Sequence, residues 1–319
     1  MKAQPIADLY ADYLLASFGA TTATGLSALL EGAISPDQVT RYLAGTQKTA
    51  SDLWRTVQSF VREVQSEVGV LIMDDSSEEK PYTDENDIVC WHDDPSKDQL
   101  RKGINFLTAW YSSPGVSVPV GFHVVAKTEK DTDSKTQKEN RRSAVSKHTV
   151  CQARIKQAVR NRLPFRFVWF AVWFASADTL VFITQHQHRD FSCPLKTTRK
   201  VALSQADNQP GRYVRVDTLE LEAQATREIY REGVDFPLVP LKQVFTNEDG
   251  SIGSRSLVSS DTTLSFDDVT TTYHKRWGGN VITSRSNRTS PWPSRPPKRS
   301  PRKPIISSPP CVALSNWRG

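Results

Sequence analysis

Two adjacent aspartates follow a short apolar run and could take part in metal chemistry. Asp74 and Asp75 come directly after residues 70–73 (VLIM), a continuous apolar run that predicts a buried strand. Two-metal phosphoryl transfer needs carboxylates from several elements, which hold two divalent ions about 3.5–4 Å apart. An aspartate at the end of a buried strand would be rigid enough for that role. Judged from the doublet alone, a solvated pair that opens a polar loop is the more ordinary interpretation.

Other reactive side chains are grouped more loosely. Cys90 lies near His92, and Cys193 follows His186 and His188, but neither group has the paired Cys-x-x-Cys spacing of a zinc site. The sequence also contains neither a phosphate-cradling P-loop nor a serine elbow motif. These patterns therefore favour neither a zinc protein nor a P-loop nucleotide hydrolase nor a serine hydrolase.

The elements that would position these groups follow from hydrophobic periodicity. Residues 1–68 are predicted to be helical. Ser35 can cap one of these helices, and the Gln38 side chain can return the capping-box hydrogen bond to it. The segments predicted after residue 69 are strands at 70–73, 104–111, 116–125 and 165–174, polar loops at 76–102 and 127–142, and a helix around 151–159.

The second half of the chain changes character twice. Residues 179–261 consist mostly of short predicted strands, with a hairpin turn at 247–250, and a helix is predicted from 265 to 277. Together the patterns predict an α/β fold. Its parts are an N-terminal helical region (1–68), a core (69–178), a β-rich segment (179–261), the start of a further helix (262–277) and a tail (278–319).

The net charge of +6 suggests a nucleic-acid partner, but it is unevenly distributed. Residues 278–319 contain six Arg, two Lys, no acidic residue and eight of the 19 prolines, which leaves 33 basic and 35 acidic residues in 1–277. A segment of that composition without a period is expected to be disordered. The positive excess therefore belongs to the tail, and a basic arm with real DNA affinity is the alternative.

The N-terminal helices leave two interpretations open. A helix, a turn at Gly32 and a second helix could form a DNA-reading unit, or an ordinary helical bundle. Residues 1–68 carry five basic and seven acidic side chains, which is a weak footprint for DNA. The sequence has no apolar run of 18 residues and no apolar signal core, so we expect a cytoplasmic protein without a membrane partner. Its four cysteines are well separated, so we expect them to be reduced.

Six sequence blocks lie in order along the chain: residues 69–86 (GVLIMDDSSEEKPYTDEN), 90–92 (CWH), 102–105 (KGIN), 234–237 (VDFP), 243–246 (QVFT) and 273–277 (YHKRW). Together they resemble bacterial insertion-sequence transposases of the DDE class, over roughly residues 20–277. The resemblance implies an RNase H-like core, a mixed sheet with flanking helices, and a β-rich insertion before the last catalytic helix. It also implies hydrolysis at transposon ends and attack of the freed 3′-hydroxyl on target DNA, with two Mg²⁺ ions. The implied partner is double-stranded DNA. The resemblance also implies a homodimer on that DNA and a location in the nucleoid.

The carboxylates of that family carry over only in part. The first aspartate, which precedes a small hydroxyl residue, matches Asp75, with Asp74 as its neighbour. The second precedes a Trp-Phe pair, which aligns with residues 173–174 and puts Ala171 at its position. A methyl group cannot bind a cation. Asp178 is the nearest carboxylate, but it lies seven residues on, and metal-ligand geometry tolerates only small errors.

The family's third motif runs Tyr, two residues, Arg, three residues, Glu, six residues, Lys. Tyr273 and Arg276 match, Lys275 adds a basic group, and Asn280 and Asn287 stand at the glutamate and lysine positions. Arginine suits a DNA phosphate because its planar fork donates two hydrogen bonds. The resemblance therefore implies DNA contacts at this helix and a missing third carboxylate.

With only Asp75 of the three metal carboxylates present, the resemblance predicts a transposase impaired in catalysis. A non-catalytic DNA-binding remnant or an inhibitor of transposition is the alternative. The third carboxylate is lost where the composition breaks, at residue 278, which suggests one cause. Our hypothesis is that the tail is an out-of-frame translation. Sequencing the coding DNA around Trp277 tests this, and absence of a family-like continuation in both other frames would exclude it.

Overall fold

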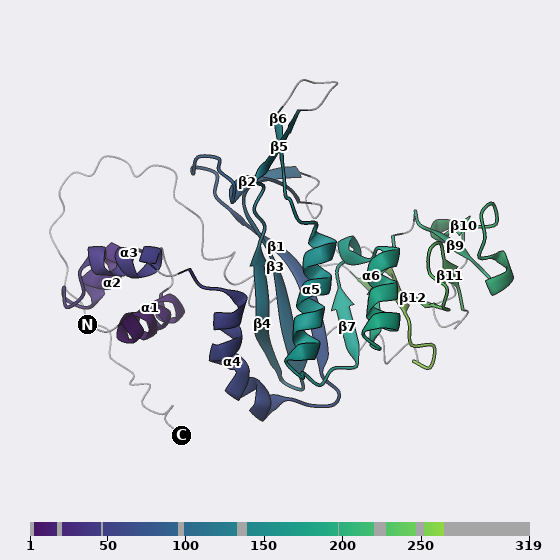
Figure 1. Ribbon diagram of the computed structural model, residues 1–319, viewed down its shortest axis with the longest axis horizontal. Helices are drawn as coiled ribbons and strands as arrows, with labels where there is room; N and C mark the ends of the chain where they lie inside the picture. Colours follow the sequence, from purple (N-terminus) through teal and green to yellow (C-terminus); the bar gives the residue numbers. More distant parts are fainter. Residues whose placement is uncertain are drawn as a thin grey trace.

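The computed structural model describes residues 3–17, 21–45, 47–94, 99–132, 139–196, 198–219, 228–246 and 252–264. These residues form a mixed α/β structure around one eight-stranded sheet, so the predicted α/β class is confirmed (Figure 1). Across the described ranges, no helix is both long and apolar enough to span a bilayer. The helix predicted at 265–277 and the tail at 278–319 lie outside the described residues.

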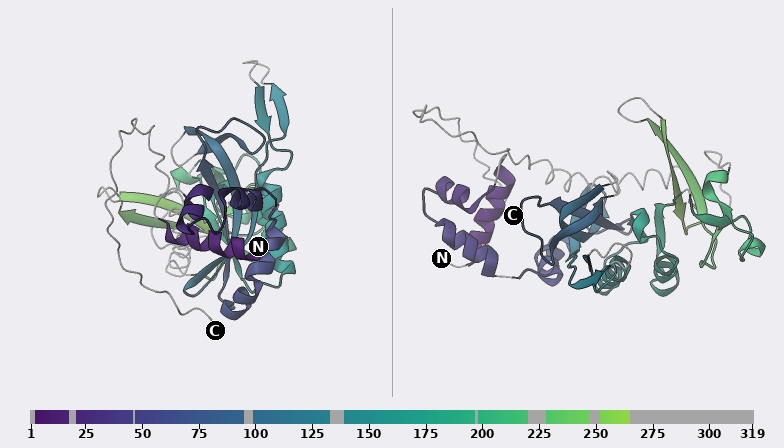
Figure 2. Two further views of the ribbon diagram at one scale, coloured as in Figure 1. Left: turned by 90° about the vertical axis from the view of Figure 1, so that its left-hand side faces the viewer. Right: turned by 90° about the horizontal axis from the view of Figure 1, so that it is seen from above.

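The N-terminal region is helical, as predicted, and consists of α1 (Ala3–Ala16), α2 (Ala23–Leu29), α3 (Pro36–Gly45) and α4 (Ala50–Val64). The predicted capping box of α3 is present, because Ser35 N donates to Gln38 Oε1 at 2.8 Å and Gln38 N donates to Ser35 Oγ at 3.2 Å. Helix α4 packs on the main sheet through Val61, whereas α1, α2 and α3 form a separate unit (Figure 2). The buried side chains of that unit are Ile6, Tyr13, Leu26, Ile34 and Val39.

The main sheet has the strands β1 (Val70–Glu79), β2 (Val89–Asp94), β3 (Gln99–Ser113), β4 (Val116–Val124), β7 (Phe167–Phe170), β8 (Asp190–Pro194), β12 (Val239–Thr246) and β13 (Ile252–Ser259). Its central order is β4-β3-β1-β7-β8. Strand β3 is antiparallel to β1 and β4, whereas β7 runs parallel to both β1 and β8. Strands β12 and β13 pair as the predicted hairpin, and β13 joins β8.

Strand β1 is central and buried on both faces at its start. Leu71 and Met73 face the main core, which α5 (Lys147–Arg160) covers (Figure 1). Val70 and Ile72 face the opposite side, where two tryptophans pack on them. Burial on both faces explains why the run is continuously apolar rather than alternating.

Several predicted boundaries are wrong because strand pairing continues through polar segments. The strand predicted at 70–73 extends to Glu79, since each residue of β1 pairs with β3. The predicted loop 76–102 contains the end of β1, all of β2 and the start of β3, and the predicted loop 127–142 contains a hairpin of β5 (Glu129–Thr132) and β6 (Glu139–Arg142). These strands lack the apolar alternation that marks a half-buried strand in a sequence.

The segment after β7 departs from the predicted long strand. The strand predicted at 165–174 ends at Phe170, and a 3₁₀ helix, η1 (Val172–Phe174), follows. The predicted boundary near residue 178 falls inside a helix, because the elements before β8 are α6 (Ala177–Val181) and η2 (Phe182–His186). The remaining elements are β9 (Lys200–Ala202), η3 (Gln205–Asp207), β10 (Val214–Arg215), η4 (Val216–Thr218) and β11 (Tyr230–Arg231).

The predicted β-rich segment therefore has two structural roles. Strands β8, β12 and β13 complete the main sheet, whereas β9, β10 and β11 form a three-stranded sheet of their own. The small sheet lies at the end of the molecule opposite α1, α2 and α3, as Figure 1 and the right-hand view of Figure 2 show.

One buried hydroxyl joins two connections of the core. The hydroxyl of Tyr111 accepts from Ser66 N at 3.0 Å and can donate to the carbonyl oxygen of Ser66 or Pro164, each 3.0 Å away. Gly69 lies so close that a Cβ there would be 2.3 Å from the same hydroxyl oxygen. The connection from α4 to β1 and the connection from α5 to β7 are thus fixed to one side chain on β3.

We predict that Tyr111→Phe lowers the free energy of unfolding by about 1–3 kcal/mol, because buried backbone groups lose their partner. Urea denaturation would measure the change. Tyr82→Phe is the matched control, since Tyr82 is 81% exposed and should change stability by less than about 0.5 kcal/mol. Equal stability of the two variants would contradict the assigned role of Tyr111.

Candidate functional site

The two aspartates lie where β1 leaves its parallel neighbour. Pairing of β1 with β7 ends at Met73 opposite Phe170, while pairing with β3 continues to Glu79. Side chains alternate along a strand, so Asp75 projects from the same face as Met73, and Asp74 projects from the other. Asp74 is buried and the Asp75 side chain is 16% exposed. The doublet is thus divided between the faces, and only Asp75 lies on the face that α5 covers.

Both carboxylate oxygens of Asp75 accept hydrogen bonds from the protein. Lys147 Nζ donates to Oδ2 at 2.7 Å, and Asn105 Nδ2 donates to Oδ1 at 2.6 Å. The same amide nitrogen lies 2.9 Å from Ser77 Oγ and 3.2 Å from the carbonyl oxygen of Ser76. Asn105 is 2% exposed, so these bonds form away from bulk water. The site is a compact polar cluster at the start of α5.

A cysteine and a histidine on β2 lie close together on a buried surface. Cys90 Sγ is 3.3 Å from His92 Nε2. Burial, together with the ammonium groups of Lys127 and Lys147, lowers the pKa of His92 to about 4, and the carboxylate of Asp75 opposes this shift. Burial also raises the pKa of the Cys90 thiol. Both groups are therefore neutral at pH 7, as a hydrogen-bonded structural pair would be.

The other positions considered for metal carboxylates lie on different elements from Asp75. Ala171 follows β7 directly and packs against the main core. Asp178 lies in the first turn of α6, where its charge acts on His148, whose pKa is lowered chiefly by burial. The residues expected at the DNA-contacting helix lie outside the described residues: Tyr273, Lys275, Arg276, Asn280 and Asn287.

The described residues do not fit the pair of Mg²⁺ ions that the family resemblance implies. Mg²⁺ requires oxygen ligands in a near-octahedral arrangement. Both oxygens of Asp75 already accept hydrogen bonds, Asn105 turns its NH₂ toward the carboxylate, and Ala171 has no side-chain oxygen. Within the described ranges, no three His, Cys, Asp or Glu side chains gather closely enough to hold a metal. That finding includes the sequence groups around Cys90 and Cys193.

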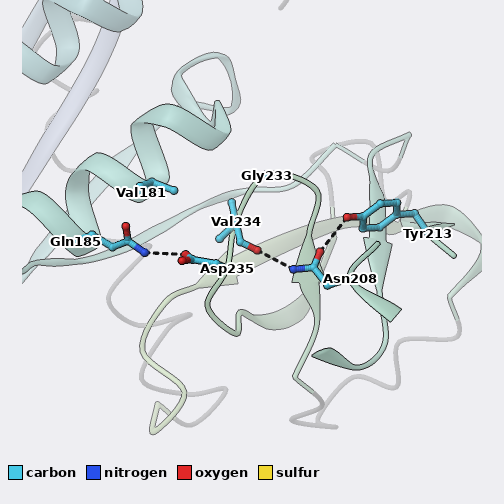
Figure 3. Close-up of a pocket in the computed structure, with 7 residues that line it drawn as sticks. All are labelled: Val181, Gln185, Asn208, Tyr213, Gly233, Val234 and Asp235. Atoms are coloured by element: carbon cyan, nitrogen blue, oxygen red, sulfur yellow. Dashed lines mark hydrogen bonds between the residues drawn. The ribbon is translucent and has the colours of Figure 1, made fainter. Parts of the chain in front are cut away.

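A pocket of about 380 Å³ lies away from these residues, between η2 and the loops around β10 and β11 (Figure 3). Gln185 Nε2 donates to Asp235 Oδ1 at 2.7 Å, Asn208 Nδ2 donates to the carbonyl oxygen of Val234 at 3.1 Å, and Tyr213 Oη donates to Asn208 Oδ1 at 3.0 Å. These polar groups satisfy one another, and no predicted site residue lines the pocket. The other lining residues are Val181 and Gly233.

Sequence reasoning missed Lys147 and Asn105. Lys147 follows the N-cap Ser146, at a helix start where the macrodipole favours an acidic residue, but this mismatch does not identify its partner. Asn105 lies in the block 102–105 beside Gly103, where a Cβ would come within 2.2 Å of the Glu78 carbonyl oxygen. That close approach of β1 and β3 brings Asn105 to the cluster.

We predict that titration of His92 destabilises the fold in mild acid. The imidazole pKa is about 4 in the folded chain against an ordinary 6.5. Between these pH values only the unfolded state takes up the proton, so stability falls as the pH drops, by up to about 3 kcal/mol. His92→Gln should flatten this part of the stability profile, measured by urea denaturation across pH. His186→Gln, at an exposed position, should not, and equal slopes for both would contradict the prediction.

Comparison with known proteins adds no family to these observations. No protein-family model matches the chain, and no curated protein matches it. A function has therefore to be inferred from the residues and from the geometry of the site.

Proposed function

We propose that the chain is, by descent, a DDE-class transposase of an insertion sequence. In this proposal it binds double-stranded DNA at transposon ends, and its metal-dependent cleavage and strand transfer are impaired. The observation that carries the proposal is the position of Asp75 and Ala171 on two adjacent central strands. Both residues lie just beyond the point where the parallel pairing of β1 and β7 ends. Those are the positions at which the resembled family carries its first two carboxylates.

The strand order supports an RNase H-like core. Strands β4, β3 and β1 form an antiparallel meander, and β7 and β8 extend it on the other side of β1 in the parallel sense. The connection between β4 and β7 contains α5, which packs on the sheet. Such a core would place the first carboxylate on β1 and the second after β7, as the matched sequence blocks imply.

An aromatic and basic surface beside Ala171 supports DNA as the partner. Trp173 is 42% exposed, and Lys196 Nζ lies 4.3 Å from the centre of its ring. An exposed aromatic ring with a cation on its face suits nucleic acid, because the ring can stack on a base and the cation can meet a phosphate. The three-helix unit of α1, α2 and α3 remains a second candidate for reading DNA.

A second function, an inhibitor that occupies transposon ends without cutting them, is favoured by the same site. Ala171 offers no ligand, and both oxygens of Asp75 are engaged. The two proposals share DNA binding, and the second adds that the bound protein blocks the transposon ends.

We predict that the protein binds duplexes taken from the flanks of its gene and cleaves neither strand above background in Mg²⁺. Gel-shift and nicking assays at low and moderate salt would measure both, with binding weakening steeply as salt rises. Asp75→Ala is the matched control and should leave the cleavage signal unchanged. Robust cleavage that Asp75→Ala abolishes would contradict the impairment, and absence of binding at low salt would exclude both functions.

A further inference from the structure

An ammonium and an amide of this chain contact the carboxylate of Asp75. Its carboxylate is 16% exposed, its Oδ2 accepts from the ammonium of Lys147 at 2.7 Å, and its Oδ1 accepts from the amide of Asn105 at 2.6 Å. We propose that Lys147 is the resident cation of Asp75, in the place where the family resemblance implies a divalent metal. The inference rests on the proposed function only for the identification of Asp75 as a metal carboxylate. The contacts of Asp75 with Lys147 and Asn105 are present in the free protein and do not depend on that function.

The position of Lys147 is explained by Asp75. Lys147 is the first residue of α5, whose first turn contains no acidic side chain. A cation at a helix N-terminus is disfavoured by the macrodipole. A carboxylate from β1 at 2.7 Å reverses this, since it attracts both the ammonium and the positive end of the helix. The pair therefore joins β1 to α5 at the site itself.

The orientation of Asn105 indicates that the carboxylate is arranged for donors rather than for a metal. Three oxygens of β1, from Asp75, Ser76 and Ser77, converge on Asn105 Nδ2, while Asn105 Oδ1 is buried and makes no hydrogen bond within the described residues. The opposite orientation would bring Oδ1 to about 2.6 Å from Asp75 Oδ1, where the two oxygens repel. An amide that ligates a cation beside Asp75 would need that opposite orientation.

Thermal melting of four full-length proteins tests the proposal: the unmodified chain, Lys147→Met, Lys147→Met with Asp75→Asn, and Lys156→Met. Lys156 lies farther along α5 at an exposed position, with its ammonium 5.2 Å from the centre of the Phe182 ring, and is the control for loss of a lysine charge from this helix. In EDTA, Lys147→Met should lower the melting temperature by roughly 3–6 °C, because a mostly buried carboxylate loses its cation. The double variant should regain most of that loss. Millimolar MgCl₂ should leave the melting temperature of the unmodified protein unchanged.

Three results would overturn the proposal. The first is a rise in the melting temperature of the unmodified protein with MgCl₂ that the double variant does not show, which would make a metal the resident cation. The second is a Lys147→Met variant as stable as Lys156→Met. The third applies if Lys147→Met does not fold, and it is a double variant that does not fold either. A folded double variant would in that case support the pair. Failure of DNA binding in the gel-shift assay would remove the proposed function and leave these melting results standing.

Discussion

The offset between the two pairings of β1 determines where the polar site can form. Strand β7 pairs with β1 only as far as Met73, whereas β3 pairs with it to Glu79. Up to that offset both faces of β1 are buried, so the first polar side chains can appear only where β7 ends. A one-residue slip of register would exchange the faces of Asp74 and Asp75.

The second consequence of the offset is electrostatic. It opens space beside Asp75 for the start of α5, and the side chain that enters this space is a lysine rather than a second carboxylate. A mostly buried carboxylate needs donors or a cation, since an uncompensated buried charge is costly. Lys147 and Asn105 meet that need from α5 and β3. The same residues therefore stabilise the contact between helix and sheet and occupy the oxygens that a metal would use.

Local signals in the sequence predict much of the fold. The capping box at Ser35 and the apolar runs around β1 and β4 are confirmed, because helix caps and buried strands depend on neighbouring residues. Strand β2 and the β5–β6 hairpin were predicted as loops, since their polar residues lack a strand period. Tertiary pairing with β3, rather than local preference, keeps β2 extended.

The site was predictable only in part, for a similar reason. The doublet and the block resemblance identify Asp75 as the candidate carboxylate and Ala171 as a missing one. The partners of Asp75 are 30 and 72 residues away in the chain, and no local pattern links an asparagine or a lysine at such distances to a carboxylate. Only the register of β1 and β3 and the packing of α5 bring these three side chains together.

Crystals of the protein soaked in Mn²⁺ would test the central claim most directly, through the anomalous signal of the metal at Asp75. We predict that Lys147 Nζ remains within hydrogen-bond distance of Asp75 Oδ2 and that no anomalous peak lies beside the carboxylate. A Mn²⁺ peak bonded to Asp75, with Lys147 turned away and Asn105 presenting its oxygen, would contradict the account.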